Sequence, residues 1–350
     1  MRFLLFLLTI LLFSACQPKA KPVVVESIAE KPLPITVADS FSAGKLYTSV
    51  ALRGNAAETF TLYLPKLYSY SAKLPLVVFF DPHGDGSVPL ALYQSLADKY
   101  NCLLLASNLS KNGMNAEQTN AIAGNLIAEA KSRFHVDEKR IALAGFSGGA
   151  KVALMAACAN EGVSSVVYCG AATNLPPNAR NFALLGFAGK RDMNYSDVIL
   201  FDQAQNSSLR RHCLLEHPGK HEWPDEKTFE NAFLFLEKGT AAKKCFELSP
   251  DLQRVLASEQ QNKQVYIQAF QTKDLNWWKQ EIASLNLKKK NDLIYERLLG
   301  FISLACYSYA NSALQQNNLP LAEHILSIYA MADPGNKDCE AFTAELRRRK

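Results

Sequence analysis

The chain has 350 residues, 48% of them hydrophobic and 20% charged, so it is long enough for more than one domain and can bury a large core. This composition excludes low-complexity disorder and a collagen-like fibre. The formal net charge of +5 is small for this length. The tight basic runs, Lys288–Lys290 and Arg347–Lys350, are typical of solvated helix ends. The charge therefore gives no sign of nucleic-acid binding.

Residues 1–15 are predicted to be a targeting segment outside the folded protein. Arg2 is followed by an eleven-residue apolar run, Phe3–Phe13, and then by the small residues Ser14 and Ala15. A run of this length suits a secretory signal peptide and is too short to span a bilayer. Removing residues 1–15, whose only charge is that of Arg2, takes the net charge from +5 to +4.

The segment Leu12–Cys16 resembles the lipobox of bacterial lipoproteins, although Phe13 stands where leucine is commoner. In that family the cysteine is lipidated and becomes the mature N-terminus, so the resemblance implies that acyl chains on Cys16 anchor the protein to the bacterial cell envelope. Gln17, rather than aspartate, follows, which by resemblance to enteric lipoproteins favours the outer membrane, facing the periplasm or the cell surface. The alternative is a plain signal peptide with Cys16 as an early mature residue.

Residues 16–40 are predicted to be the lipidated cysteine and a tether, because residues 17–35 hold four prolines and little periodic pattern. Seven cysteines follow Cys16, and an odd number cannot all pair. No CxxC spacing occurs, so no zinc site is expected, and no other metal or organic cofactor is implied. Buried thiols are expected in four apolar runs, at Cys102, Cys158, Cys169 and Cys213. Whether two of Cys245, Cys306 and Cys339 form a disulfide cannot be inferred from the sequence and is left open.

Residues 45–240 alternate between strand and helix patterns, which predicts a mostly parallel sheet covered by helices on both faces. The first two strands flank Gly54 and Asn55 as an antiparallel hairpin, and most of the others are continuous apolar runs. The expected strands are 45–53, 58–64, 74–80, 102–106, 140–144, 165–169, 182–188 and 211–217. The expected helices are 90–100, 116–134, 149–159, 196–206 and 226–237. Such sheets bind ligands at the carboxyl ends of their strands.

A serine follows the strand 140–144 in the run Gly145-Phe146-Ser147-Gly148-Gly149, directly before a helix. The glycines allow the strand and helix backbones to approach closely, so that Ser147 would project its hydroxyl at a helix N-terminus. The bare G-x-S-x-G pattern occurs by chance in many chains. Its position between a strand and a helix makes Ser147 the expected nucleophile.

An acid follows the strand 182–188 at Asp192, where it could accept a hydrogen bond from an imidazole and hold its tautomer. Asp197 and Asp202 are the alternatives, and both lie further along in the next helix.

A histidine, His221, lies in the loop between the last strand and the last helix of this region, two residues after Gly219. A neutral imidazole there could take the proton of Ser147 and return it to a leaving group. The rival is His217, at the end of the strand itself.

The chain order Ser147, Asp192, His221 resembles that of the α/β-hydrolase superfamily. The motifs Val136–Gly149 and Gly219–Pro224 are similar to its esterase branch, which includes feruloyl esterases, polyhydroxybutyrate depolymerases and dienelactone hydrolases. The resemblance covers roughly residues 45–240. It departs from dienelactone hydrolases, which use a cysteine nucleophile. It also departs from many lipases, because only residues 171–181 stand where those carry a lid.

The segment Asp81–Gly86 looks like the oxyanion loop of that superfamily. By analogy, the backbone N–H of Gly84 or Asp85 would join that of Gly148 in holding a tetrahedral oxyanion. The motif loops, with the polar loop 108–113, supply four candidates for contact with the substrate: His83, Phe146, Asn108 and Trp223. For the loop 108–113 an ordinary turn is the favoured interpretation.

Residues 241–350 carry amphipathic helix patterns at 251–270, 275–287, 293–315, 319–332 and 338–348. Ser303–Asn336 spans 34 residues, the length of a tetratricopeptide repeat. Small, apolar and proline positions of that repeat match Ala310, Ala322, Leu326 and Pro334, whereas Tyr329 departs from the usual alanine. One helical hairpin of this type is predicted, packed on its neighbours. Its role is left open between binding a protein partner and stabilising the fold.

The chain is thus expected to comprise a signal peptide (1–15), a tether (16–40), an α/β-hydrolase domain (41–240) and an all-α helical-hairpin domain (241–350). The expected activity is that of an exported serine hydrolase that cleaves carboxylic esters, small or glycan-linked, through an acyl-enzyme. The alternatives are a serine peptidase of the same fold and a membrane-tethered binding protein with an inactive hydrolase domain.

Overall fold

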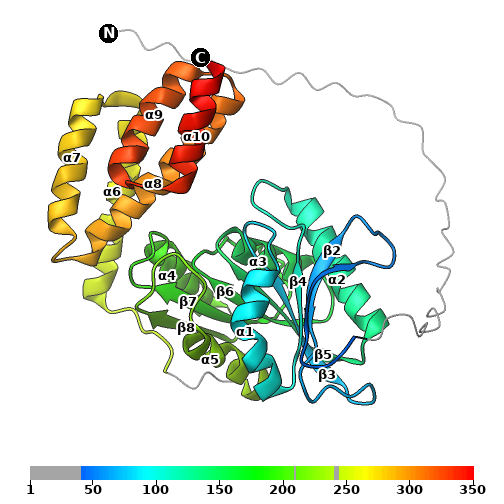
Figure 1. Cartoon of the computed structure of the whole chain (residues 1–350). Coiled ribbons are helices and arrows are strands. Elements are labelled where there is room, and N and C mark those ends of the chain that lie inside the picture. Colours follow the sequence, from blue (N-terminus) through cyan, green and yellow to red (C-terminus); the bar gives the residue numbers. More distant parts are fainter. Residues whose placement is uncertain (1–40, 209, 240–243) are drawn as a thin grey trace, which may run out of the picture. The chain divides into compact units, whose positions relative to one another are not determined.

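A single eight-stranded sheet forms the centre of the first part of the chain (Figure 1). The computed structural model describes residues 41–208, 210–239 and 244–350, so the predicted signal peptide, Cys16 and tether lie outside the described residues. The strands are β1 (Leu46–Ala51), β2 (Thr59–Tyr63), β3 (Leu74–Phe80), β4 (Leu103–Ser107), β5 (Val136–Phe146), β6 (Val163–Cys169), β7 (Ala183–Gly189) and β8 (His212–His217).

The strand order is β1-β2-β4-β3-β5-β6-β7-β8, with β1 and β2 antiparallel to their neighbours and all other pairs parallel. The helices that cover the sheet are α1 (Ser87–Tyr100), α2 (Ala116–Arg133), α3 (Gly148–Ala159), α4 (Tyr195–Ala204) and α5 (Glu226–Lys238). One core cluster joins α2, α3 and α4 to one face of the sheet, and a second joins α1 and α5 to the other face. This order and layering confirm the predicted α/β-hydrolase fold.

The buried strand β3 shows why the central strands read as continuous apolar runs. Leu76, Val78 and Phe80 belong to the core cluster on one face, whereas Val77 and Phe79 belong to the cluster on the other. Successive side chains of a strand point to opposite faces, so a strand between two helical layers must be apolar at every position.

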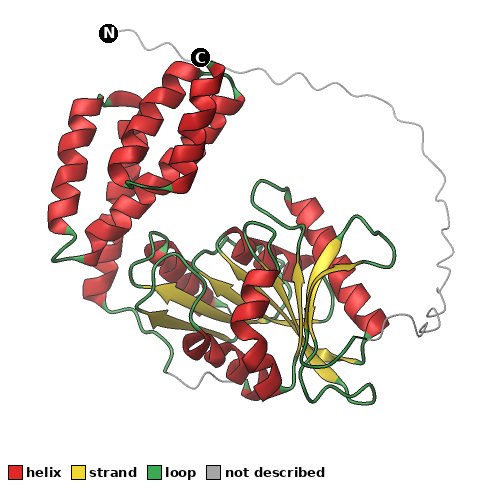
Figure 2. Cartoon of the chain, in the orientation of Figure 1, coloured by secondary structure: helices red, strands yellow, loops and turns green. Residues whose placement is uncertain are grey.

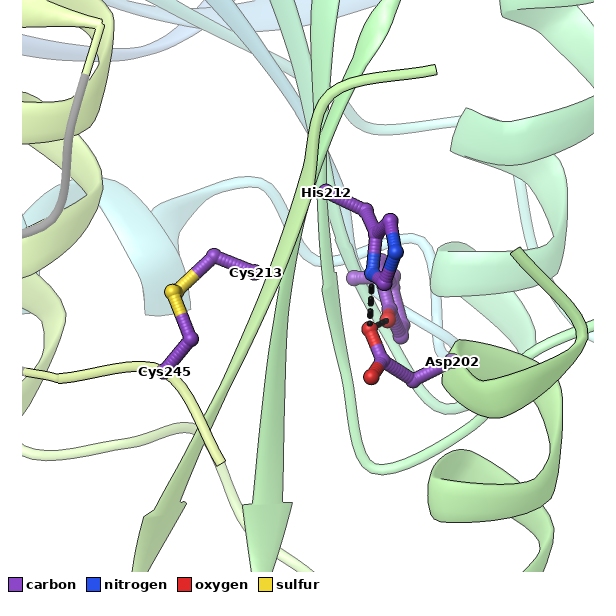
Figure 3. The surroundings of a disulfide bond; sticks show 5 residues. Asp202, His212, Cys213 and Cys245 are labelled. Atoms are coloured by element: carbon purple, nitrogen blue, oxygen red, sulfur yellow. Dashed lines mark hydrogen bonds and ion pairs between the residues drawn. A yellow bond between two sulfur atoms is a disulfide. The ribbon is translucent and has the colours of Figure 1, made fainter. Parts of the chain in front are cut away.

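A disulfide joins Cys213 of β8 to Cys245, which are 32 residues apart (Figure 3). His212, the preceding residue, points to the opposite face of the strand and contacts Asp202 (Figure 3). The expectation that Cys213 is a free buried thiol was therefore wrong, and Cys306 and Cys339 are buried free thiols. Because β8 is an edge strand, the disulfide holds the segment around Cys245 against an edge of the sheet that would otherwise be exposed.

We expect the Cys213→Ser, Cys245→Ser double variant to lose about 3 to 4 kcal/mol of unfolding free energy, because a loop of this length is no longer closed in the unfolded chain. Urea denaturation of the oxidised wild type and of the variant measures the difference. The Cys306→Ser, Cys339→Ser variant, which removes two thiols but no disulfide, is the control. An equal loss in both variants would assign the effect to side-chain burial and not to the cross-link.

From Pro250 onward, the second part of the chain consists of helices joined by short turns (Figure 2). Its helices are α6 (Pro250–Thr272), α7 (Leu275–Lys288), α8 (Leu293–Gln315), α9 (Leu319–Ala332) and α10 (Lys337–Arg349). Each begins after a residue whose side chain accepts a backbone N–H of the first turn, namely Ser249, Asp274, Asp292, Asn318 and Asn336. Such caps satisfy N–H groups that have no partner within the helix.

The predicted hairpin corresponds to α8 and α9, which are joined by a short turn with Asn317 in the left-handed conformation. Ala310, Ala322, Leu326 and Tyr329 are all buried in the core of the helical region. This confirms a helical hairpin, and its assignment as a tetratricopeptide-type repeat stays a prediction. No helix among the described residues is long and apolar enough to cross a membrane.

Candidate active site

Ser147 occupies a sharp turn between the end of β5 and the start of α3. Its φ of 53° and ψ of −122° lie in a region that side chains other than glycine rarely adopt. The turn is fixed because the Ser147 N–H donates to the Cys169 carbonyl of β6 at 2.9 Å, while the Ser147 carbonyl accepts from Ala150 at 3.0 Å. A strained backbone held by its neighbours in this way is common where a side chain has a function.

The glycines of the turn are required by contact between backbones. A Cβ on Gly145 would lie 2.0 Å from the Gly149 carbonyl oxygen, and a Cβ on Gly149 would lie 1.9 Å from the Phe80 carbonyl oxygen. Neither atom belongs to a flexible side chain that could move aside. The start of α3 therefore lies directly against β5 and the end of β3.

We expect Gly149→Ala to lower the unfolding free energy by about 3 kcal/mol or more, because the new methyl group overlaps β3 and the strand must shift. Chemical denaturation of soluble protein measures this loss. Gly54→Ala is the matched control, since nothing lies within 4 Å of a Cβ at that position. Equal stability of the two variants would contradict the close packing described here.

Three predicted residues meet at the carboxyl end of the sheet. His221 Nε2 lies 2.9 Å from Ser147 Oγ, and His221 Nδ1 lies 2.9 Å from both Asp192 Oδ1 and Asp192 Oδ2. The Asp192 carboxylate is buried, with 2% of its side chain exposed, whereas 22% of the His221 side chain is exposed. The candidate nucleophile, base and orienting acid are thus joined in one hydrogen-bonded chain.

The rival residues make other contacts. Asp197 pairs with Lys263, and Asp202 pairs with His212. His217 Nδ1 accepts the Gly219 N–H at 3.2 Å, which shapes the loop that presents His221. Burial raises the pKa of the Cys169 thiol well above its usual range, so this neighbouring sulfur stays a thiol. Ser147, which is half-buried, is therefore the candidate nucleophile at this strand end, and the buried Cys169 is not.

The loops that carry the acid and the histidine are joined by backbone hydrogen bonds. Lys190 N–H donates to the His217 carbonyl at 2.8 Å, and Arg191 N–H donates to the Gly219 carbonyl at 3.1 Å. Asp192 Oδ1 also accepts the Asn194 N–H at 2.8 Å. The backbone of its own loop therefore fixes the Asp192 carboxylate in the orientation that faces the His221 imidazole.

The predicted oxyanion loop, residues 81–86, directly follows Phe80 of β3, whose carbonyl group lies against Gly149 of the serine turn. The Gly84 N–H donates to the Asp81 carbonyl at 3.1 Å within the loop, which leaves the Asp85 N–H as the candidate among the two predicted donors. Gly148 is the first residue of α3, and a first-turn N–H has no partner within its own helix. Asp85 and Gly148 are therefore the candidate donors.

Asp81 fixes this loop and was not singled out from the sequence. It is buried, Oδ1 accepts the His83 N–H at 2.9 Å, and Oδ2 accepts the Trp223 indole N–H at 2.9 Å. Trp223 follows His221 closely in the chain. One carboxylate thus joins the oxyanion loop to the histidine loop.

The residues predicted near the substrate differ in their surroundings. Phe146 is buried and packs against His221 and Trp223, with ring centroids 4.7 Å and 5.6 Å away. Trp223 is buried as well, so these two rings support the loop, whereas the His83 side chain is 83% exposed.

The Asn108 amide contacts the scaffold rather than an open surface. Its Oδ1 accepts from Thr61 Oγ1 at 2.9 Å and from the Gly86 N–H at 3.2 Å, and its Nδ2 donates to the Thr48 carbonyl at 2.9 Å. The residue of this loop that reaches the serine turn is Asn112, because a Cβ on Gly148 would lie 1.8 Å from Asn112 Oδ1. No sequence pattern marked Asn112, whose position depends on how the loop folds.

Within the described ranges, no group of three or more His, Cys, Asp or Glu residues could hold a metal ion.

No protein-family model and no curated protein matches this sequence. Among solved structures, the chain is similar to a hyperthermophilic esterase from the archaeon Pyrobaculum calidifontis, with 13% identity and a TM-score of 0.47 over 57% of this chain and 87% of that one. It is similar to a thermostable carboxylesterase cloned from a metagenomic library, with 14% identity and a TM-score of 0.45 over 59% and 92% of the two chains. It is also similar to esterase B from Lactobacillus rhamnosis, with 15% identity and a TM-score of 0.46 over 58% and 89%. The α/β-hydrolase fold is identified by the chain's own strand order and by the helical layers on both faces of the sheet.

Proposed function

We propose that the protein is a serine hydrolase that cleaves carboxylic esters through an acyl-enzyme. The observation that carries the proposal is the hydrogen-bonded chain from Ser147 Oγ through both nitrogens of His221 to Asp192. The three residues come from the ends of three different strands, and the serine lies at a helix N-terminus. Structural hydrogen bonds seldom combine these features with a strained serine backbone.

In the proposed reaction, Ser147 Oγ attacks the ester carbonyl carbon while its proton passes to His221 Nε2. The carbonyl oxygen becomes an oxyanion that the Gly148 and Asp85 N–H groups stabilise. The bond to the leaving alcohol then breaks, and the alcohol oxygen takes the proton from Nε2. Water repeats the sequence on the acyl-enzyme, releasing the acid and restoring Ser147. Asp192 accepts from His221 Nδ1 throughout, which leaves Nε2 as the basic nitrogen.

We propose glycan-linked acyl or feruloyl esters as the leading substrate class. Only residues 170–182 connect β6 to β7, and this segment contains no helix, so no lid of the lipase type covers the site from there. An open site suits a bulky substrate that is cleaved at its surface. Comparison of sugar esters with simple alkyl esters of the same acyl group tests this class.

Labelling with a fluorophosphonate probe tests the proposed activity directly, because the probe forms a bond to an activated serine oxygen. We expect labelling at Ser147 alone, identified by mass spectrometry of the modified peptide. Ser147→Ala should remove it, and Ser327→Ala, on the exposed side of α9, should not. Folded wild-type protein that takes up no probe would contradict the proposal. Parallel assays of ester and amide substrates separate an esterase from a peptidase.

The chain of hydrogen bonds also argues against a binding protein with an inactive hydrolase domain, since such a protein has no need to keep both the Ser147–His221 and the His221–Asp192 contacts at 2.9 Å. Whether the helical region binds a protein partner stays an open prediction.

We further propose that the protein is exported and lipidated at Cys16. The Cys213–Cys245 disulfide supports export, because disulfides persist in oxidising compartments outside the cytosol.

In a bacterial host, we expect metabolic incorporation of labelled palmitate into the full chain, because the proposed lipidation attaches acyl chains to Cys16. Several such chains are needed for stable anchoring. Cys16→Ser should abolish incorporation and move the protein from the membrane fraction to the soluble envelope fraction. The control Cys158→Ser should change neither result. Incorporation that survives Cys16→Ser would contradict the lipidation site.

A further inference from the structure

The helices α6 and α8 contact the segment 190–197, which carries Asp192. Arg297 of α8 donates through Nη1 to the Lys190 carbonyl at 2.9 Å. Lys263 of α6 donates through Nζ to the Met193 carbonyl at 2.7 Å. These two carbonyls lie on either side of Asp192 in the chain. The backbone around the acid is therefore held from both directions by cations of the helical region.

These cations are themselves buried and fixed. The side chains of Arg297 and Lys263 are 5% and 3% exposed, and that of Glu259 in α6 is 0% exposed. Arg297 forms a two-pronged contact with Glu259, with Nε 3.1 Å from each oxygen and Nη2 2.6 Å from Oε2. The Arg297 guanidinium also lies 4.6 Å from the Tyr195 ring centroid. A planar guanidinium held at this many points has little freedom to shift.

A third contact links the acid loop to the histidine loop. Glu296 of α8 accepts from Arg191 Nε at 2.9 Å and from Nη2 at 2.7 Å, and Lys220 Nζ lies 3.9 Å from the same carboxylate. Arg191 precedes Asp192, and Lys220 precedes His221. One residue of the helical region therefore touches the neighbours of both the acid and the base.

Close approach of α8 is part of the arrangement. A Cβ on Gly300 would lie 3.3 Å from the Met193 Cβ. Apolar side chains could attach two helices to a domain without the desolvation that buried charges require, and a buried ion pair contributes little net stability. What these charges add is direction. Arg297 Nη1 donates to the Lys190 carbonyl, and Lys263 Nζ donates to the Met193 carbonyl and also to Ser196 Oγ and Asp197 Oδ2, each at 3.0 Å, so all of these contacts fall within the segment 190–197.

We propose that the helical region positions the catalytic acid, with Arg297 and Lys263 as positioning residues that set the distance from Asp192 to His221. This rests on the proposed function, in which Asp192 orients His221. A displacement of about 1 Å in a catalytic group can lower a rate on the order of a hundredfold. The helices would thus act on kcat without touching the substrate.

The test uses the full chain and the variants Arg297→Met and Lys263→Met. We expect each to lower kcat for a short p-nitrophenyl ester by about ten- to a hundredfold while KM stays within about twofold. The matched control is Arg133→Met, because Arg133 also forms a buried ion pair, with Glu129 of α2, on a helix that does not contact the acid loop. We expect this control to lose stability but to keep wild-type kcat in its folded fraction.

Because a lone buried Glu259 would destabilise Arg297→Met, the double variant Glu259→Met, Arg297→Met removes both charges and keeps the fold. A second readout is the downfield proton resonance of the His221 Nδ1–H that faces Asp192, identified by its loss in His221→Ala. We expect it to shift or broaden in the Arg297, Lys263 and double variants and not in Arg133→Met. An unchanged resonance with kcat within twofold of wild type in all three would overturn the positioning role.

This readout separates the two proposals. If the wild type takes up no fluorophosphonate, the proposed function fails, while the resonance still reports whether the helices set the His221–Asp192 contact.

Discussion

Replacing Ser147 by alanine is expected to lower kcat for a short p-nitrophenyl ester by about 10⁵- to 10⁶-fold, because the variant lacks the atom that forms the acyl-enzyme. The melting temperature should stay close to that of the wild type. Ser147 is only half-buried, and its hydroxyl contacts His221 through a hydrogen bond that water can replace. Steady-state kinetics and a thermal melt of the same preparation measure both effects. A variant that keeps more than 1% of the wild-type kcat would remove Ser147 from the chemistry.

The same position offers a test of backbone strain. Residue 147 has a φ of 53°, in a region of backbone conformation that glycine adopts without strain and that other residues rarely adopt. Ser147→Gly should therefore be as inactive as Ser147→Ala and more stable by about 1 kcal/mol. Denaturation of the two inactive variants measures the difference without interference from catalysis. A glycine variant less stable than the alanine variant would show that the turn is not strained.

The sequence patterns that predicted the fold well are those in which one property decides the structure. For β3, α8 and α9 the predicted bounds are those observed, because continuous apolar runs and capped amphipathic runs have few alternative structures. The strand β5 begins at Val136, four residues before the predicted start. Its first part, Asp137–Arg140, is polar and partly exposed, so no pattern of burial marks it as a strand. Pairing across the sheet decided that boundary.

The helix α1 begins at Ser87, three residues before the predicted start. Pro89 lies in its first turn, where the missing N–H of proline costs nothing. The pairing of Cys213 with Cys245 was beyond prediction for another reason. It depends on the path of residues 244–248, where Phe246 N–H donates to the Leu214 carbonyl at 2.7 Å.

The residues of the candidate site also differ in whether the sequence could predict them. Strand ends and chain order pointed to Ser147, Asp192 and His221, because parallel strands bring their carboxyl ends to one edge. The structure places these three side chains in hydrogen-bond contact, and their catalytic roles stay a prediction. The supporting residues could not be selected in this way. Asp81, Asn112 and Arg297 act on loops distant in sequence, and only the packed chain brings them there.

A substitution of Asp192, the proposed acid, is expected to have the second large effect on kcat. We expect Asp192→Asn to lower kcat by roughly 10⁴-fold, since the amide would stabilise the wrong tautomer of His221. One carboxylate oxygen of Asp192 accepts the Asn194 N–H at 2.8 Å, and the amide oxygen must keep that contact. The amide NH₂ then faces His221 Nδ1 and donates to it, so the imidazole proton moves to Nε2. An Nε2 that carries a proton cannot accept one from Ser147.

The matched control for this change is Asp202→Asn, because Asp202 is another buried carboxylate that pairs with a histidine, His212, at 3.0 Å. That pair lies at the start of β8, whereas His221 follows the end of the same strand. Asp202→Asn should therefore change stability and leave kcat within about threefold of the wild type. Steady-state kinetics of both variants, with circular dichroism to establish folding, decides the matter. Equal kcat losses in the two variants would mean that activity responds to buried carboxylates in general, and Asp192 would then have no special part in orienting His221.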